Sequence, residues 1–267
     1  MSWWKKILGQ GGAAPRSGAR AKARAKAAPE PPPPPPPPPP PKPAIRADDR
    51  RIGAGRAQRL SHWRRFGRAE HEPLTYADNS DLHGAPDWPA GRKCYHVIHR
   101  YDSLILTTDG LSDPFVGTTS DGESGYGVEV FLEIPETGAM PFDEVRESWA
   151  FALLEIVSQN IAGFGGIADR LAREEVVLMS VPVLNPPAPD WVDEIGYTGV
   201  LIGLPARRVA TEIALPLGPV RFTAVTLLRP DEAAFAQRGH DERADLAEAL
   251  KLRGYDHFSD PERPSVL

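Results

Sequence analysis

The sequence is poor in cysteine and has no long apolar run. Its one cysteine, Cys94, cannot form a disulfide within the chain or supply a site made of several thiolates. No segment approaches the roughly twenty apolar residues that cross a bilayer, and the N-terminus, MSWWKKILG, holds only a short apolar stretch. We therefore expect a cytoplasmic protein in a reducing compartment, neither secreted nor embedded in a membrane.

Charge is divided unevenly along the 267 residues. Residues 1–70 hold sixteen lysines and arginines against four aspartates and glutamates, whereas residues 71–267 hold fifteen against thirty-two. The chain is therefore a basic arm, at +12, joined to an acidic body, at −17. Such a charge distribution bears on binding partners and solubility rather than on the fold. The arm could bind nucleic acid, anionic lipid or the acidic body of its own chain.

Residues 1–67 have the composition of a disordered arm. Eleven consecutive prolines at 31–41 predict an extended polyproline II spacer, which an aromatic-lined groove of a partner could also bind. The tryptophans near the N-terminus would share one face of a short helix that could rest on an anionic membrane. Residues 44–67 could form a basic helix, which we interpret as a lid for the body rather than a nucleic-acid reader. The apolar residues of this segment at helical spacing are Leu60, Trp63 and Phe66.

Residues 68–267 have the pattern of a single compact α+β domain, in which a mixed sheet is packed by helices. Residues 95–106 predict one long strand or two short ones, rich in Val, Ile, Leu and Tyr. Residues 127–134 alternate apolar side chains with Glu129 and Glu133. This alternation predicts a half-buried strand whose two glutamates face water.

A long helix is predicted from Pro141 to about Ala162, where apolar residues recur at the spacing of a buried stripe. This helix would cover one face of the sheet. The order of strands, helix, strands and helices favours an α+β domain over strict βαβ alternation. The remaining strands are expected at 176–184, 199–204 and 220–228, and the remaining helices from Pro230 and from Asp241 to Arg253.

Ser112 lies in Gly110-Leu111-Ser112-Asp113-Pro114, which differs from the G-x-S-x-G nucleophile elbow because Pro114 replaces the last glycine. The elbow turns from a strand into a helix, but the residues that follow Pro114 show no helix pattern. We therefore interpret the hydroxyls and carboxylates of residues 107–113 as turn formers that bond neighbouring backbone amides. A serine hydrolase that uses Ser112 with a histidine such as His240 or His257 is kept as an alternative.

Metal and phosphate sites are not expected. His96 and His99 are three residues apart, so on a strand they point to opposite faces. Cys94 shares the face of His96, but no carboxylate at the same spacing completes a ligand set. The glycines of residues 163–166 follow a helix and lack the Lys-Ser/Thr pair that grips a phosphate. We therefore expect no metal, no cofactor and no pair of acid and base.

Several motifs resemble the suppressor of fused family in its bacterial single-domain form, over residues 95–266. The strand and turn from Leu106 to Asp113 are similar to a family turn of leucine, threonine, a small residue, glycine, methionine, serine and aspartate. The other matching segments follow in the family's order, and they are residues 129–135, 149–157, 197–202, 225–232 and 259–264.

The resemblance implies a binding module without catalysis. Animal relatives hold a peptide of a transcription factor between two lobes as an added strand, and bacterial relatives are associated with toxin and immunity genes. This sequence shows no second lobe after Leu267, so the clamp of two lobes is not expected. We therefore expect a non-catalytic protein-binding domain with Asp109, Ser112 and Asp113 at the rim of its binding surface.

Two readings of the partner stay open. The protein could be an immunity protein that sequesters a basic toxin, whose approach the acidic body would speed at low salt. It could also be an adaptor that its arm tethers to membrane or nucleic acid, which we favour less because the arm lies outside the resemblance.

Overall fold

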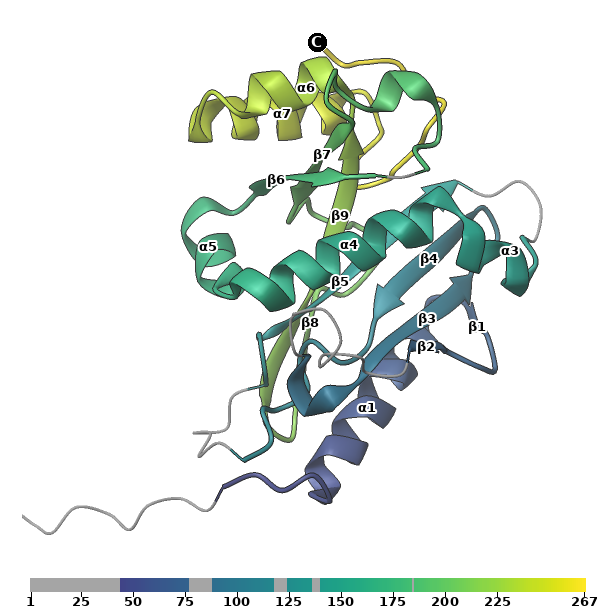
Figure 1. The fold of residues 1–267 in the computed structure, drawn as a ribbon, viewed down its shortest axis with the longest axis vertical. Coiled ribbons are helices and arrows are strands. Elements are labelled where there is room, and N and C mark those ends of the chain that lie inside the picture. The colour runs from purple at the N-terminus through teal and green to yellow at the C-terminus, as the bar shows by residue number, and fades with distance from the viewer. Residues whose placement is uncertain (1–43, 77–87, 118–123, 136–139, 184) are drawn as a thin grey trace, which may run out of the picture. The chain divides into compact units, whose positions relative to one another are not determined.

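The computed structural model describes residues 44–76, 88–117, 124–135, 140–183 and 185–267 (Figure 1). Most of the predicted arm, with its polyproline spacer, lies outside the described residues. Residues 41–267 form one compact unit. The predicted α+β class, a mixed sheet packed by helices, is confirmed for this unit.

A nine-stranded mixed sheet forms the centre of the described unit. Its strands are β1 (Arg68–Ala69), β2 (Leu74–Tyr76), β3 (Lys93–His99), β4 (Ser103–Thr108), β5 (Val128–Pro135), β6 (Val177–Pro182), β7 (Tyr197–Ile202), β8 (Glu212–Leu215) and β9 (Gly218–Leu228). The main order is β1-β3-β4-β5-β9-β7-β6, with β2 also beside β3 and β8 also beside β9. Only the β5–β9 pair is parallel among the described strand pairs, so chain segments far apart in sequence meet at the middle of the sheet.

Helix α4 (Trp149–Phe164) covers one face of the sheet, as predicted, and crosses in front of β4 and β5 in Figure 1. The predicted long helix is broken before it, since α3 (Phe142–Glu147) ends at Ser148, whose backbone is extended. The Ser148 hydroxyl donates to the Val145 carbonyl at 2.7 Å and accepts from the Phe151 amide at 3.2 Å. One serine therefore ends α3 and caps α4.

Helix α1 (Arg50–Trp63) packs on the opposite face. Its last residue, Trp63, makes edge contacts with Phe131 at 5.2 Å and Phe222 at 5.0 Å between ring centroids, and His62 stacks on Phe222 at 4.4 Å. We expected the compact domain to begin at residue 68, yet α1 precedes that residue and belongs to the same unit. The basic helix expected within residues 44–67 thus forms and covers the body, but its arginines had been counted with the disordered arm, which concealed their ion pairs with the body.

The prediction that Glu129 and Glu133 face water is wrong. Both side chains are 0% exposed, because β5 lies in the middle of the sheet between β4 and β9 and its second face is also covered. Alternation of polar and apolar residues therefore reports two different buried environments here, one apolar and one made of ion pairs.

The α-helices that follow α4 in the described chain are α5 (Ile167–Glu174), α6 (Pro230–Ala236) and α7 (His240–Leu252). Helices α6 and α7 pack against the far end of the sheet, whereas the buried residues of α5, Ile167 and Leu171, join the core beneath α4. Arg263 then reaches back to Glu232 with two hydrogen bonds of 2.6 Å, and both side chains are fully buried. This pair fixes the C-terminal segment to the start of α6.

None of the described helices is long and apolar enough to cross a membrane by itself. Helices α4 and α5 meet the length and composition of a span only together, and they are bent by 99° at the break between them.

Candidate functional site

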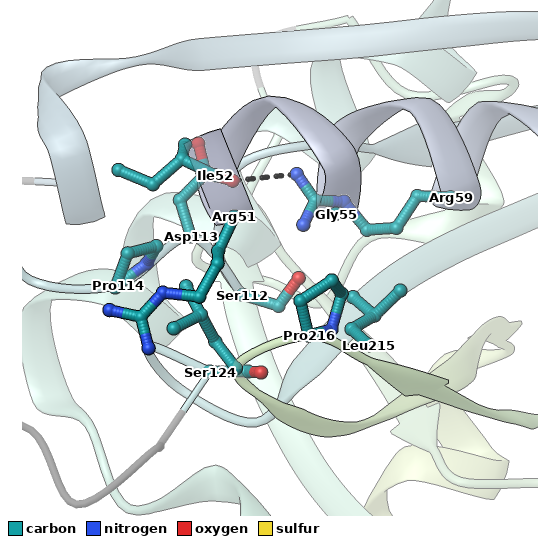
Figure 2. A pocket seen from close by; sticks show the side chains of 11 residues that line it. Arg51, Ile52, Gly55, Arg59, Ser112, Asp113, Pro114, Ser124, Leu215 and Pro216 are labelled. Carbon is teal, nitrogen blue, oxygen red and sulfur yellow. Dashed lines mark hydrogen bonds and ion pairs between the residues drawn. The ribbon is translucent and has the colours of Figure 1, made fainter. Parts of the chain in front are cut away.

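The residues predicted to line a binding surface converge beneath α1. Asp109 and Asp113 follow β4, and Glu129 comes from β5; we call these three carboxylates the acidic cluster. Arg59 reaches the cluster from α1, and its Nε donates to Asp109 Oδ1 at 2.6 Å while its Nη2 donates to Asp113 Oδ1 at 2.7 Å. Figure 2 shows the contact of Arg59 with Asp113 from close by. One guanidinium thus bridges two aspartates.

Further guanidinium groups complete the ion pairs. Arg56 donates to Asp113 Oδ2 from Nε at 2.8 Å and from Nη2 at 2.5 Å, and Arg92 donates to Asp109 Oδ2 at 3.0 Å. The side chain of Arg59 is only 2% exposed. Buried charges are tolerated when opposite charges and hydrogen bonds compensate them, and both aspartates have such partners on each oxygen.

The ionisation of the cluster follows from these contacts. Burial alone would raise the pKa of Asp109, but Arg59 and a hydrogen bond from His96 outweigh it and hold that pKa well below its usual value. Burial alone would lower the pKa of Arg59, but the carboxylates around it raise that pKa instead. Arg59 and Asp109 therefore stay charged at neutral pH.

Glu129 organises the turn that follows β4. Its Oε1 accepts from the amides of Gly110 and Ser112, both at 3.0 Å, and from the Ser112 hydroxyl at 2.6 Å, while its Oε2 accepts from the Thr108 hydroxyl at 2.6 Å. Burial, followed by the charge of Asp109, raises the pKa of Glu129. We expected the turn hydroxyls to bond neighbouring amides, which is wrong for Ser112 and Thr108. Their acceptor is a carboxylate from the next strand of the sheet.

The predicted site residues Asp109, Ser112 and Asp113 are brought together but buried. In this conformation α1 covers them, so they could form an accessible rim only if α1 moved. The sequence analysis did not identify Arg59, Arg56 or Glu129 as site residues. Arg56 and Arg59 are three residues apart, which puts both on one face of a helix, and this spacing could have indicated from the sequence that they act together.

The two histidines considered as partners for Ser112 lie elsewhere. His257 Nε2 lies 2.7 Å from Glu133 Oε2, and His240 is exposed at the start of α7 beside Asp241. Among the hydrogen bonds of the described residues, none joins Ser112 to a histidine. The geometry therefore gives the Ser112 hydroxyl a place in the turn, as a donor to Glu129.

Glu133 forms a second buried charge centre on β5. It accepts from Arg100 at 2.7 Å and from the Ser103 hydroxyl at 2.6 Å, in addition to its contact with His257. Burial alone would raise the pKa of Glu133, but the hydrogen bonds from His257 and Ser103 lower it. Because the Ser259 amide also donates to the Glu133 carbonyl at 2.9 Å, this centre ties the C-terminal segment to the middle of the sheet.

Cys94, His96 and Asp109 lie close enough to be considered as metal ligands, with their ligand atoms within 4.8 Å of one another. We expected no carboxylate to complete such a set, which is wrong, because the neighbouring strand supplies Asp109. Arg92 already donates to Cys94 Sγ at 3.0 Å and to Asp109. Burial raises the pKa of Cys94 to about 12, with a further contribution from Asp109, so the thiol is protonated. A cation here would have to displace guanidinium groups.

Strand β6 forms an open end of the described sheet. It pairs with β7 and, within the described residues, has no strand on its other side. Its sequence, VLMSVP, carries no charge, and Ser180 and Pro182 are exposed. On the adjoining segment Ile195 is 78% exposed and Tyr197 is 39% exposed. We call Val177–Pro182 together with Ile195 and Tyr197 the β6 edge.

A groove of about 620 Å³ lies between α5, α7 and the segment after β7. Charges of both signs line it, and several are paired across or along it, such as Arg207 with Asp256 at 3.3 Å and Lys251 with Glu248 at 2.6 Å. Paired charges of mixed sign do not define one class of ligand, so the groove is less specific than the acidic cluster.

No model of a known protein family matches the sequence, and no functionally curated protein matches it. Several solved structures are similar to the chain. The crystal structure of a Sufu–Fu complex aligns with a TM-score of 0.46 at 16% identity, over 80% of this chain and 92% of that one. Drosophila Suppressor of Fused aligns with a TM-score of 0.42 at 16% identity, over 73% of this chain.

The alignment covers only 42% of the Drosophila chain. At 16% identity, both similarities concern the fold alone.

Proposed function

We propose that this protein is a non-catalytic protein-binding domain that captures an extended segment of its partner along the β6 edge. The observation that carries the proposal is an uncharged strand at one end of the sheet that, among the described residues, pairs on one side only and has exposed apolar residues beside it. Sheet edges are usually protected by charge, bulges or covering elements because they template pairing with another chain. An edge without charge is suited to receiving a strand of a partner.

We infer further that the partner is basic, with a toxin held by an immunity protein as the specific case. The compact unit of residues 41–267, which includes α1, holds 24 lysines and arginines against 35 aspartates and glutamates, a net charge of −11, and an acidic surface raises the rate of encounter with a basic protein. The resemblance to the bacterial family supports it as well.

The β6 edge is tested by placing a charge on it. Ser180→Lys puts an ammonium group on an exposed position of β6, and Ser61→Lys makes the same change on the exposed side of α1. Both variants and the unaltered protein are used to capture partners from a lysate of cells that express the chain. A captured protein is then purified and its affinity for each variant is measured. We expect Ser180→Lys to lose the partner and Ser61→Lys to keep it.

Two results would contradict the proposal. Equal affinity for Ser180→Lys and the unaltered protein would show that the partner binds elsewhere. Turnover of any substrate by the purified protein, abolished by one substitution, would show catalysis. The toxin reading has its own test, because expression of the captured partner alone should arrest growth and co-expression of this chain should restore it.

A further inference from the structure

We propose that the acidic cluster is a binding site for a basic helix of a partner, and that residues 50–59 of α1 occupy this site in cis. The site is distinct from the β6 edge. It is identified by its occupant, since α1 shows which side chains fit: an aliphatic residue, an arginine four positions later and a second arginine three positions after that. These are Ile52, Arg56 and Arg59, which all point to the body from one face of α1.

The fit is chemical as well as geometric. The planar fork of Arg59 donates to two different aspartates, and Arg56 donates from two of its nitrogens to Asp113. A guanidinium makes such forked contacts, whereas an ammonium group is a single point charge. The cluster therefore distinguishes arginine from lysine. If α1 leaves, Asp113 loses its contacts with Arg56 and Arg59, and the arginines of a partner helix can take their place.

Residues 50–59 of α1 are held by few contacts besides the arginines. Ile52 packs in a small apolar group with Ile45 and Leu217, separate from the main cores. A cavity of only about 10 Å³ lies between α1, Pro114 and residues 215–217 (Figure 2). Trp63 anchors the C-terminal end of α1 through its aromatic contacts. Residues 44–59 could therefore open while Trp63 stays in place.

Two glycines weaken the helix itself. A methyl group placed on Gly53 would meet no atom within 4 Å, and one on Gly55 would meet only ordinary contacts at 3.8 Å and beyond. Packing therefore requires neither glycine, although glycine lowers helix propensity. A helix of 14 residues is marginal by itself in water. The segment is thus helical because it is docked, and undocking would return it to a flexible chain.

The test uses a fluorescent peptide with the sequence of residues 44–61 and the full-length protein. In the unaltered protein the tethered copy competes with the peptide, so binding is weak. Arg59→Ala weakens the tethered copy, and we expect the apparent affinity for the peptide to rise about a hundredfold. Arg46→Ala is the matched control, because Arg46 is 81% exposed and its ion pair within the described part of the chain is with exposed Asp48. It should bind the peptide as weakly as the unaltered protein.

Specificity has two controls. A peptide with glutamine in place of Arg56 and Arg59 should not bind the Arg59→Ala protein. The original peptide should not bind a protein that carries both Arg59→Ala and Asp113→Asn. Ser180→Lys should leave peptide binding unchanged, which separates this site from the β6 edge. If Arg59→Ala binds no peptide while the amides of β5 remain protected from hydrogen exchange, the proposal is wrong.

Hydrogen exchange of the unaltered protein gives a second test that needs no substitution. We expect the amides of residues 52–59 to exchange through local opening, at least tenfold faster than those of β4 and β5. Equal protection of α1 and β5 would show that α1 leaves the body only when the whole domain unfolds. That result would overturn the proposal even if Arg59→Ala failed to fold.

Discussion

Glu129 can be changed in two ways that separate its hydrogen bonds from its charge. Glu129→Gln keeps the shape of the side chain and one acceptor oxygen, whereas Glu129→Ala removes both oxygens. Three of the four donors converge on Oε1 and only the Thr108 hydroxyl bonds Oε2. We therefore expect glutamine to preserve most of the turn and alanine to disrupt it.

The magnitudes follow from the count of donors. Alanine leaves the amides of Gly110 and Ser112 and the Ser112 hydroxyl without this acceptor, whereas the Thr108 hydroxyl keeps the Val130 carbonyl at 3.3 Å. Each of these three buried groups costs about 1–3 kcal/mol when unsatisfied, so we expect a loss of about 3–9 kcal/mol. Glutamine can turn its oxygen toward the three donors and its amide toward the Thr108 hydroxyl oxygen. Because Arg59 keeps Asp109 and Asp113 as partners, the expected loss for glutamine is within about 1 kcal/mol.

Urea denaturation followed by circular dichroism measures both variants against the unaltered protein. The midpoint should fall slightly for Glu129→Gln and greatly for Glu129→Ala, with similar slopes. Equal losses for the two variants would refute the reasoning, because they would show that the charge near Arg59, at 3.5 Å, matters more than the four hydrogen bonds.

The pH dependence adds an independent check. Burial raises the pKa of Glu129 in the folded protein above its usual value of 4.5, so the unfolded chain loses its proton first as the pH rises. The part of the stability that comes from this raised pKa is therefore complete below pH 4.5 and is lost as the pH rises through the pKa of Glu129 in the folded protein. Glutamine lacks this loss. The free energy of unfolding of Glu129→Gln should therefore rise relative to that of the unaltered protein as the pH rises from 4.5. A relative fall would contradict the raised pKa of Glu129.

Three further predictions concern other sites. Arg263→Met leaves Glu232 buried without its partner and should lower the free energy of unfolding by about 3–5 kcal/mol in urea denaturation; an unchanged midpoint would contradict the role of the pair. Ser112→Ala should fold, and neither it nor the unaltered protein should react with a fluorophosphonate probe; stoichiometric labelling lost in the variant would instead establish the hydrolase. Burial lowers the pKa of His62 below 6.5, so stability should fall as the pH drops below 6.5, and His62→Phe should remove part of that slope in thermal denaturation; an identical slope would exclude His62 as its source.

The main elements could be predicted from the sequence because their signals are local. Alternation or apolar enrichment marked β5, β6, β7 and β9, and the stripe on residues 149–164 marked α4. The break at Ser148 was not predicted, since it depends on a hydroxyl that serves two helices. The short strands β1, β2 and β8 were missed because two to four residues carry too little periodicity.

The site could be predicted only in part. The turn residues Asp109, Ser112 and Asp113 were identified as a group, but their surroundings depend on pairing between distant segments. Arg59 lies 50 residues before Asp109 in the sequence, and no periodicity reports such a contact. The glutamates of β5 were placed in water because alternation usually means one wet face, and only the position of β5 within the sheet shows that both faces are covered.

The burial of these charges changes how the acidic body should attract a partner. Asp109, Asp113, Glu129 and Glu133 are buried and paired with guanidinium or imidazole groups. Paired and buried charges contribute little to the field outside the protein, so the effective charge that a partner meets is set by the exposed carboxylates. The rate of association should therefore depend less steeply on salt concentration than the net charge of −17 on residues 71–267 predicts. Opening α1 would uncover Asp109 and Asp113 and strengthen that field where an arginine-bearing helix would dock.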